Sequence, residues 1–171
     1  NARYVRVTVN GNTANNYAHI TELDVFGLSG SCTANLPASA VKASSSDSGY
    51  PPSNVLDNDR STRWSSPTVG SWIQVDLGAT KNICSVDIAW WKGNERQYHF
   101  VIATSTDGTT FTTKLTSSSS GTTLNSEKYI IGSTNARYVR VTVNGNTANN
   151  YAHITELDVF APGDKFGIIK L

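Results

Sequence analysis

Apolar and polar residues alternate with a period of two in several stretches of the chain. The stretch "SWIQVDLG" sets Ile73 and Val75 against polar neighbours, and "YVRVTVNG" does the same with Val139 and Val141. Successive side chains of a strand point to opposite faces, so this period predicts strands buried on one side. No stretch of ten residues keeps a convincing period of 3.6. Several short strands at roughly even spacing predict an all-β, antiparallel sandwich.

The first 26 residues, "NARYVRVTVNGNTANNYAHITELDVF", occur again unchanged at 135–160, an offset of 134 positions. Solenoid repeats are only about 20–50 residues long, so this period is that of a whole domain. We expect the apolar face of the first copy to be buried against another sandwich, since an isolated hairpin is marginal in water. We predict that residues 1–26 are the last two strands of a preceding near-identical domain, or a donor hairpin. Residues 27–35 are then a linker and 36–160 a complete domain. Residues 161–171 are a linker and the start of a following segment.

Composition and charge argue against several classes of function. The net charge is +1 and 16% of residues are charged, so the chain lacks the basic footprint of a nucleic-acid binder. The longest apolar runs are far too short for a membrane span. We find no paired carboxylates, no nucleophile with a base, and no clustering of the three histidines. We therefore predict a protein that is not an enzyme.

Cys32 and Cys84 are the two cysteines of the chain. Two are too few for a disulfide framework and do not by themselves make a zinc site. They are either two buried thiols or one disulfide that pins the segment before the domain to a central strand. A disulfide, with the low charge, favours an extracellular setting.

The loop "NVLDNDRSTRW", residues 54–64, is rich in oxygen ligands. Asp57, Asp59 and Thr62 lie within six positions, and Ca²⁺ prefers six to eight oxygens. The loop could also be capped by its own side chains, with no metal. Trp64, directly after it, is either a core residue or a platform for a sugar ring.

Three other loops carry candidate sugar-binding side chains. A sugar needs an aromatic face for its C–H surface and polar groups for its hydroxyls or carboxylate. The alternatives are solvated loops with an incidental aromatic residue, and for one tyrosine, packing under a neighbouring proline. The candidates are Trp91, Lys92, Asn94 and Arg96 in "WWKGNERQY", Tyr50 in "SSSDSGYPPS", and Asn149 and Tyr151 in "NGNTANNYAH".

The motifs "SNVLDNDRSTRWSS", "SWIQVDLG", "STDGTTF", "RYVRVTVNG" and "ITELDVF", in that order, resemble the discoidin family, also called the coagulation factor 5/8 type C domain. Within it, the sequence is most similar to carbohydrate-binding module family 32 and to modules attached to alginate lyases. The resemblance implies an eight-stranded β-sandwich of jelly-roll type. It also implies a structural calcium whose loop ligands are joined by Glu156 of the last strand. Ile154 and Leu157 are both apolar and three positions apart, which breaks the alternation and predicts a bulge near Thr155 that turns Glu156 toward the loop.

These observations predict a non-catalytic, extracellular module of a tandem-repeat protein that binds a polysaccharide or glycan, with acidic glycans among the candidates. The alternative is a structural subunit of an extracellular filament or surface array. In that case the repeated terminal hairpin of one copy would complete the sandwich of a neighbouring copy, head to tail.

Overall fold

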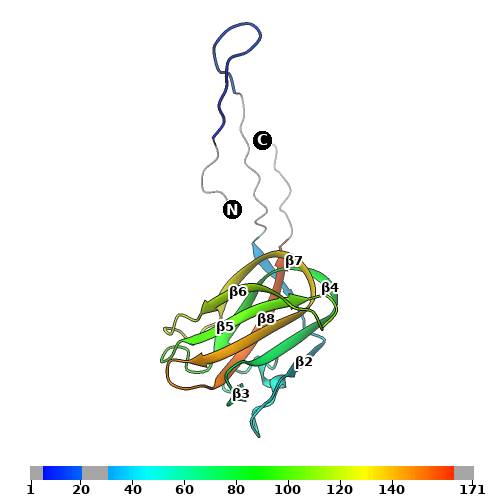
Figure 1. The fold of residues 1–171 in the computed structure, drawn as a ribbon, viewed down its shortest axis with the longest axis vertical. Coiled ribbons are helices and arrows are strands. Elements are labelled where there is room, and N and C mark those ends of the chain that lie inside the picture. The colour runs from blue at the N-terminus through cyan, green and yellow to red at the C-terminus, as the bar shows by residue number, and fades with distance from the viewer. Residues whose placement is uncertain (1–5, 21–30, 164–171) are drawn as a thin grey trace.

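A computed structural model describes residues 6–20 and 31–163. Residues 31–163 form a sandwich built almost entirely of antiparallel strands (Figure 1). One short 3₁₀ helix, η1, covers Pro52–Val55. The strands are β1 (Cys32–Leu36), β2 (Ala40–Ala43), β3 (Trp64–Ser66), β4 (Ser71–Trp90), β5 (Tyr98–Ser105), β6 (Thr112–Ser118), β7 (Glu127–Asn146) and β8 (Ala152–Pro162). The expected all-β, eight-stranded architecture is confirmed.

The two long strands, β4 and β7, each contribute to both layers of the sandwich. The first part of β4 pairs with β2 and with the last part of β7, and β5 and β6 continue this layer. The second part of β4 pairs with the start of β7 and with β8, which also pairs with β1 and β3. The pairing of β4 with β7 shifts register between Asp76 and Lys81. Gly78 lies in that interval with a φ of 76°, a conformation that favours glycine.

The core lies between the layers and consists of the inward residues of the alternating stretches. Ile73, Val75, Val141 and Val143 are at most 1% exposed. Trp64 is fully buried, and its indole N–H donates to the Ser45 carbonyl at 2.9 Å, so it is a core residue and not a sugar platform. Burying such side chains contributes roughly 1.5–3 kcal/mol each, before the cost in chain entropy. The period-two pattern thus identified the core-facing sides of the strands.

The duplicated stretch has different structures at its two positions. In the second copy it forms the end of β7 and most of β8. In the first copy, residues 6–20 contain no strand and lie outside the sandwich (Figure 1). Val7 and Val9, which we expected to be buried, are 48% and 37% exposed in this single chain. The rest of the expected hairpin, residues 1–5 and 21–26, lies outside the described residues, as does the expected following segment at 164–171.

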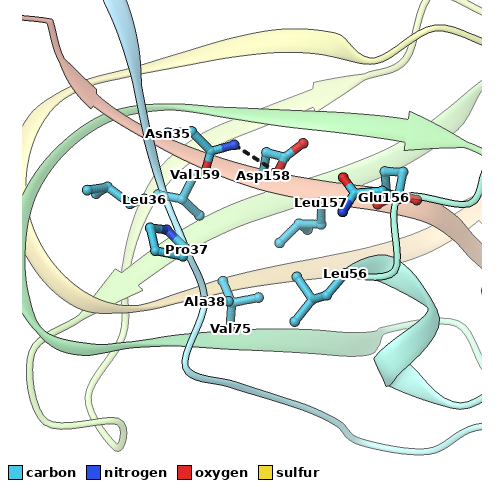
Figure 2. A pocket seen from close by; sticks show the side chains of 11 residues that line it. Asn35, Leu36, Pro37, Ala38, Leu56, Val75, Glu156, Leu157, Asp158 and Val159 are labelled. Atoms are coloured by element: carbon cyan, nitrogen blue, oxygen red, sulfur yellow. Dashed lines mark hydrogen bonds between the residues drawn. The ribbon is translucent and has the colours of Figure 1, made fainter.

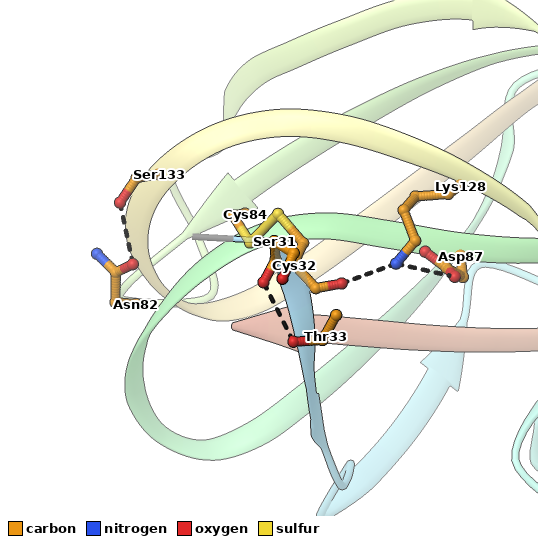
Figure 3. The surroundings of a disulfide bond; sticks show 8 residues. All are labelled: Ser31, Cys32, Thr33, Asn82, Cys84, Asp87, Lys128 and Ser133. Atoms are coloured by element: carbon orange, nitrogen blue, oxygen red, sulfur yellow. Dashed lines mark hydrogen bonds and ion pairs between the residues drawn. A yellow bond between two sulfur atoms is a disulfide. The ribbon is translucent and has the colours of Figure 1, made fainter. Parts of the chain in front are cut away.

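The strand β1 begins within the segment that we expected to be a linker. It pairs with the end of β8, and a disulfide joins Cys32 to Cys84 with their Cα atoms 5.8 Å apart (Figure 3). Lys128 Nζ donates to the Cys32 carbonyl at 2.8 Å and lies 3.4 Å from the Asp87 carboxylate. Closing a loop of 52 residues in the unfolded chain is worth about 4 kcal/mol in the chain-entropy description. These contacts hold β1 against the sandwich from Cys32 onward.

Within residues 6–20 and 31–163, no helix is long and apolar enough to cross a membrane.

Candidate functional site

The candidate sugar-binding loops converge at the end of the sandwich where β8 begins. Trp64 of β3 and Trp90 of β4 both pair with Ile154. The loop that precedes β3 and the loop that follows β4 therefore lie on either side of the first residues of β8. Pro162 pairs with Cys32 at the other end of β8. The loops thus lie at the end of the sandwich opposite the start of β1 and the end of β8 (Figure 1).

Arg63 lies between two of the predicted aromatic residues. Its guanidinium carbon is 4.1 Å from the centre of the Tyr50 ring and 4.2 Å from the centre of the Trp91 ring. A guanidinium stacks well on an aromatic face and keeps its N–H edge free for planar acceptors. The structure thus brings Tyr50 and Trp91 together, through an arginine to which the sequence analysis gave no role.

A second arginine and a buried histidine lie beside this stack. His153 is 7% exposed, its ring is stacked on Tyr151 at 5.2 Å, and its Nδ1 has no hydrogen-bond partner. Burial, followed by the nearby charges of Arg63 and Arg96, lowers the pKa of His153 to about 4. The imidazole is therefore neutral at neutral pH. The two arginines create a positive field at this end of the molecule.

Hydrogen bonds fix the loop after β4 in place. The Tyr98 hydroxyl donates to the Trp91 carbonyl at 2.7 Å, and the Arg96 amide donates to the Lys92 carbonyl at 3.2 Å. Arg96 Nε is buried and has no partner.

We refer to Tyr50, Arg63, Trp91, Arg96, Tyr151 and His153 as the arginine cluster.

The other predicted ligand residues take different positions. Lys92 forms an ion pair with Glu95 at 3.1 Å. Together with Asn94 it lines a hollow on which the arginine cluster borders only through Trp91. Asn149 uses its side-chain oxygen within its own loop, where it accepts from Asn146 Nδ2 and from the Tyr151 amide. A ligand contact from Asn149 stays a prediction.

The oxygen-rich loop after η1 is organised by its own side chains. Asp57 accepts from the Asp59 amide at 2.9 Å and from the Thr62 hydroxyl at 2.7 Å, and Asp59 accepts from the Ser61 amide at 2.8 Å. This arrangement is the capped loop that we considered as the alternative to a metal site. In the described part of the chain, no three His, Cys, Asp or Glu side chains form a group that could hold a metal. Any cation here would also need backbone carbonyls and the Thr62 hydroxyl.

Glu156 faces this loop, as the bulge near Thr155 predicted. The register of β4 against β8 shifts between Ala89 and Trp90, which leaves Thr155 without a partner in the ladder. Glu156 is 7% exposed, and its Oε1 has no hydrogen-bond partner. Burial, followed by the charge of Asp57, raises its pKa to about 7. It borders a cavity of about 240 Å³ beside β8 (Figure 2). A buried carboxylate oxygen without a donor is what a hard cation would satisfy, so these residues fit a Ca²⁺ ion.

Comparison with known proteins identifies the sandwich. The F5/8 type C domain family matches residues 40–157, which is well over half of the chain. The chain belongs to the F5/8 type C family. This F5/8 type C domain is 31% identical over 117 residues to a sialidase of Micromonospora viridifaciens, in a match that covers 63% of the chain and 18% of the sialidase.

Solved structures of family 32 carbohydrate-binding modules (CBM32) have the same fold. The CBM32 of AlyQ, in complex with 4,5-unsaturated mannuronic acid, superimposes with a TM-score of 0.73 at 38% identity, covering 75% of this chain and 98% of that one. Truncated AlyQ with CBM32 and alginate lyase domains gives 0.74 at 37% identity, covering 77% of this chain and 34% of that one. A pectin-binding carbohydrate-binding module gives 0.69 at 31% identity, covering 71% of this chain and 89% of that one. The F5/8 type C domain thus spans only a minor part of the sialidase and of truncated AlyQ.

The sequence analysis missed two important members of the arginine cluster. Arg63 directly precedes the buried Trp64 in "STRW", and strand alternation turns it away from the core. His153 directly precedes the buried Ile154 and is turned away in the same way. That alternation was readable in the sequence. The stacking of Arg63 on Tyr50 and Trp91 was not, because it joins three different loops.

Proposed function

We propose that this domain is a non-catalytic module that binds an acidic glycan outside the cell, with the arginine cluster as its binding site. The observation that carries the proposal is the guanidinium of Arg63 held between two aromatic rings, with Arg96 close by. A stacked guanidinium has lost much of its freedom before a ligand arrives, so less entropy is lost on binding. The disulfide supports an oxidising location.

A uronate is the sugar that this chemistry fits best. Its carboxylate can accept two parallel N–H donors from a guanidinium, and its ring can pack its C–H face on an aromatic side chain. His153 is neutral at neutral pH because its pKa is lowered to about 4. It can therefore donate or accept a hydrogen bond to a hydroxyl without adding charge. The AlyQ module in complex with 4,5-unsaturated mannuronic acid, and the pectin-binding module, support a uronate ligand.

We also propose a structural Ca²⁺ held by Asp57, Asp59, Thr62 and Glu156. The buried, partnerless Oε1 of Glu156 and the nearby carboxylate of Asp57 support this assignment. An ion would join the loop after η1 to β8, and it would contribute stability by mass action. A chelator is then expected to lower the melting temperature, and added Ca²⁺ to restore it. An unchanged melting curve would remove calcium from the proposal.

Calorimetric titration with oligouronates and with neutral oligosaccharides of equal length tests the binding site. Arg96→Gln is expected to weaken uronate binding more than tenfold, because a charge-assisted hydrogen bond is lost. Lys81→Gln is the matched control, since Lys81 is exposed on β4 and pairs with Ala136, outside the converging loops. Binding of uronates should also weaken as salt is raised. If wild type binds no uronate, the proposal fails.

A second candidate function, assembly through the repeated stretch, is favoured by one observation. Val7 and Ile20 are 48% and 51% exposed, whereas the identical positions Val141 and Ile154 are fully buried. We propose that residues 1–26 complete another sandwich of the same sequence, so that binding domains occur in series. Series of weak sites bind a polymer with high avidity. If the other sandwich belongs to a separate molecule, the same contact builds a filament or surface array.

Deletion of residues 1–26 tests this assembly. Light scattering over a range of concentrations should show self-association of the full chain and none of the deletion variant. The melting temperature of the sandwich should be unchanged, because the segment makes no part of it in the described residues. A full chain that stays monomeric at all concentrations excludes the filament and leaves only domains in series within one polypeptide.

A further inference from the structure

Trp91 belongs to the arginine cluster and also borders a hollow beside it. This hollow, of about 380 Å³, lies between the loop after β4, the loop between β6 and β7, and Arg60 of the oxygen-rich loop. Its lining includes the buried Trp90 and Thr155, which are 1% and 3% exposed. Arg63, Arg96 and His153 are not among its lining residues. Its volume is within the range of about 300–1,000 Å³ of small-molecule sites.

Contacts between the three loops build this hollow. The Thr123 amide donates to the Gly93 carbonyl at 3.3 Å, and Arg60 donates to Asn125 Oδ1 at 3.0 Å. A Cβ at Gly93 would lie 2.6 Å from the Thr123 carbonyl oxygen, so the loops approach this closely only because residue 93 is glycine. The walls are therefore fixed without a ligand.

The chemistry of the walls suits a sugar ring. Leu124 is 54% exposed and lies with Trp90 and Trp91 in the same lining, so the hollow offers an apolar surface to C–H groups. Arg60 and Lys92 also line it, against one carboxylate, Glu95, which is paired with Lys92. The lining therefore carries a net positive charge. Among the described residues, Arg60 forms no ion pair with a carboxylate.

We propose that this hollow is a second sugar subsite, which holds the neighbouring residue of an acidic glycan whose first residue binds at the arginine cluster. The inference rests on the proposed function of that cluster. The two sites are continuous because one side chain, Trp91, stacks on Arg63 and also lines the hollow. A single indole thus separates two sites that each combine aromatic surface with positive charge. We expect the two sites together to favour a chain of uronates over a single uronate.

Titration with a uronate monosaccharide, disaccharide and trisaccharide tests the second subsite. Wild type is expected to bind the trisaccharide at least tenfold more tightly than the monosaccharide. Leu124→Thr and Arg60→Gln should each remove most of this gain with length while changing monosaccharide affinity little. Ile130→Thr is the matched control for Leu124→Thr, because Ile130 is 60% exposed on β7 and does not line the hollow. The control should keep the full gain.

The outcomes separate the subsite from the binding function itself. If the monosaccharide binds and longer chains bind no better, the hollow is not a subsite and the arginine cluster stands alone. If Leu124→Thr weakens all three ligands equally, the hollow is not separate from the cluster. If no uronate binds to wild type, the proposed function fails and the subsite with it. Melting curves of both variants should match wild type, since both substituted residues are exposed.

Discussion

Residues 6–20 and 140–154 have identical sequences but only partly identical structures. Both contain the same turn: the amide of Asn12 donates to the Asn15 carbonyl at 2.9 Å, and that of Asn146 donates to the Asn149 carbonyl at 2.8 Å. The side-chain bonds agree as well, at 2.8 Å from Asn Nδ2 to Asn Oδ1 in each copy. Gly11 and Gly145 have φ values of 93° and 89°.

The flanking residues of the two copies differ completely. Val141 and Val143 are fully buried in β7, whereas Val7 and Val9 are exposed and belong to no strand. The turn is closed by hydrogen bonds between residues at most five positions apart, so its own sequence is sufficient. The strands need partners from distant parts of the chain, such as β4 and β5. The same sequence therefore forms the turn in both copies, but it forms strands only where neighbouring strands of a sheet are present.

The largest difference between the copies is expected for an aspartate in the apolar face. Val141→Asp should destabilise the sandwich by more than about 4 kcal/mol, because it buries an unpaired charge. Val7→Asp should change stability by less than about 0.5 kcal/mol in the single chain. Urea denaturation measures both. Equal effects would mean that the first copy is buried in solution, and would support its docking on another sandwich.

The histidines of the two copies provide a second contrast, in the dependence of stability on pH. Burial lowers the pKa of His153 to about 4, so between about pH 6.5 and 4 the unfolded state binds more protons and stability falls as pH falls. This contributes about 1–3 kcal/mol. In protein freed of Ca²⁺, Glu156, whose pKa is raised to about 7, acts in the opposite sense and loses its contribution as pH rises from 4.5 through 7.

The comparison of variants isolates the histidine from this opposing effect. His153→Gln should lose less stability on acidification than wild type, measured by urea denaturation at several pH values. His19→Gln, the same change in the exposed first copy, should follow the wild-type curve. An acid-dependent loss in His153→Gln as large as that of wild type would show that other groups cause it.

A smaller effect is expected on ligand binding. Tyr151 is stacked on His153 beside the two arginines, whereas Tyr17 is 71% exposed. Tyr151→Ala should weaken uronate binding about tenfold, or about 1.4 kcal/mol, and Tyr17→Ala should leave it unchanged. Calorimetric titration checks both. If Tyr17→Ala weakens binding as much as Tyr151→Ala, the first copy also forms part of a binding site.

The smallest effect concerns the shared turn. Asn146 accepts from the amides of Ala148 and Asn149 and donates to the Tyr151 carbonyl. Asn146→Ala should lower the stability of the sandwich by about 1 kcal/mol. Asn12→Ala should leave global stability unchanged but move the local amide shifts toward random-coil values, measured by NMR. If Asn12→Ala leaves those local shifts unchanged, the turn does not depend on its own side chains.

The sequence alone determined the strands, their inward faces and the family of this protein. Period-two alternation identified Val139 and Val141 as core residues, and the spacing of Ile154 and Leu157 indicated the bulge that turns Glu156. Each of these depends on residues close together in the chain, so local pattern is sufficient. The sequence also predicted that Tyr50, Trp91 and Arg96 belong to the site, since they are aromatic or charged residues in predicted loops.

Only the tertiary structure determined which of the predicted residues lie together. Arg63 lies between Tyr50 and Trp91 with His153 beside them, whereas Lys92 and Asn94 line a different hollow. These contacts join loops that are far apart in sequence, and their geometry depends on where β3, β4 and β8 bring the loop ends. The tertiary structure also decided which of two identical stretches becomes a strand, because a strand is stabilised by the sheet that it joins and not by its own residues.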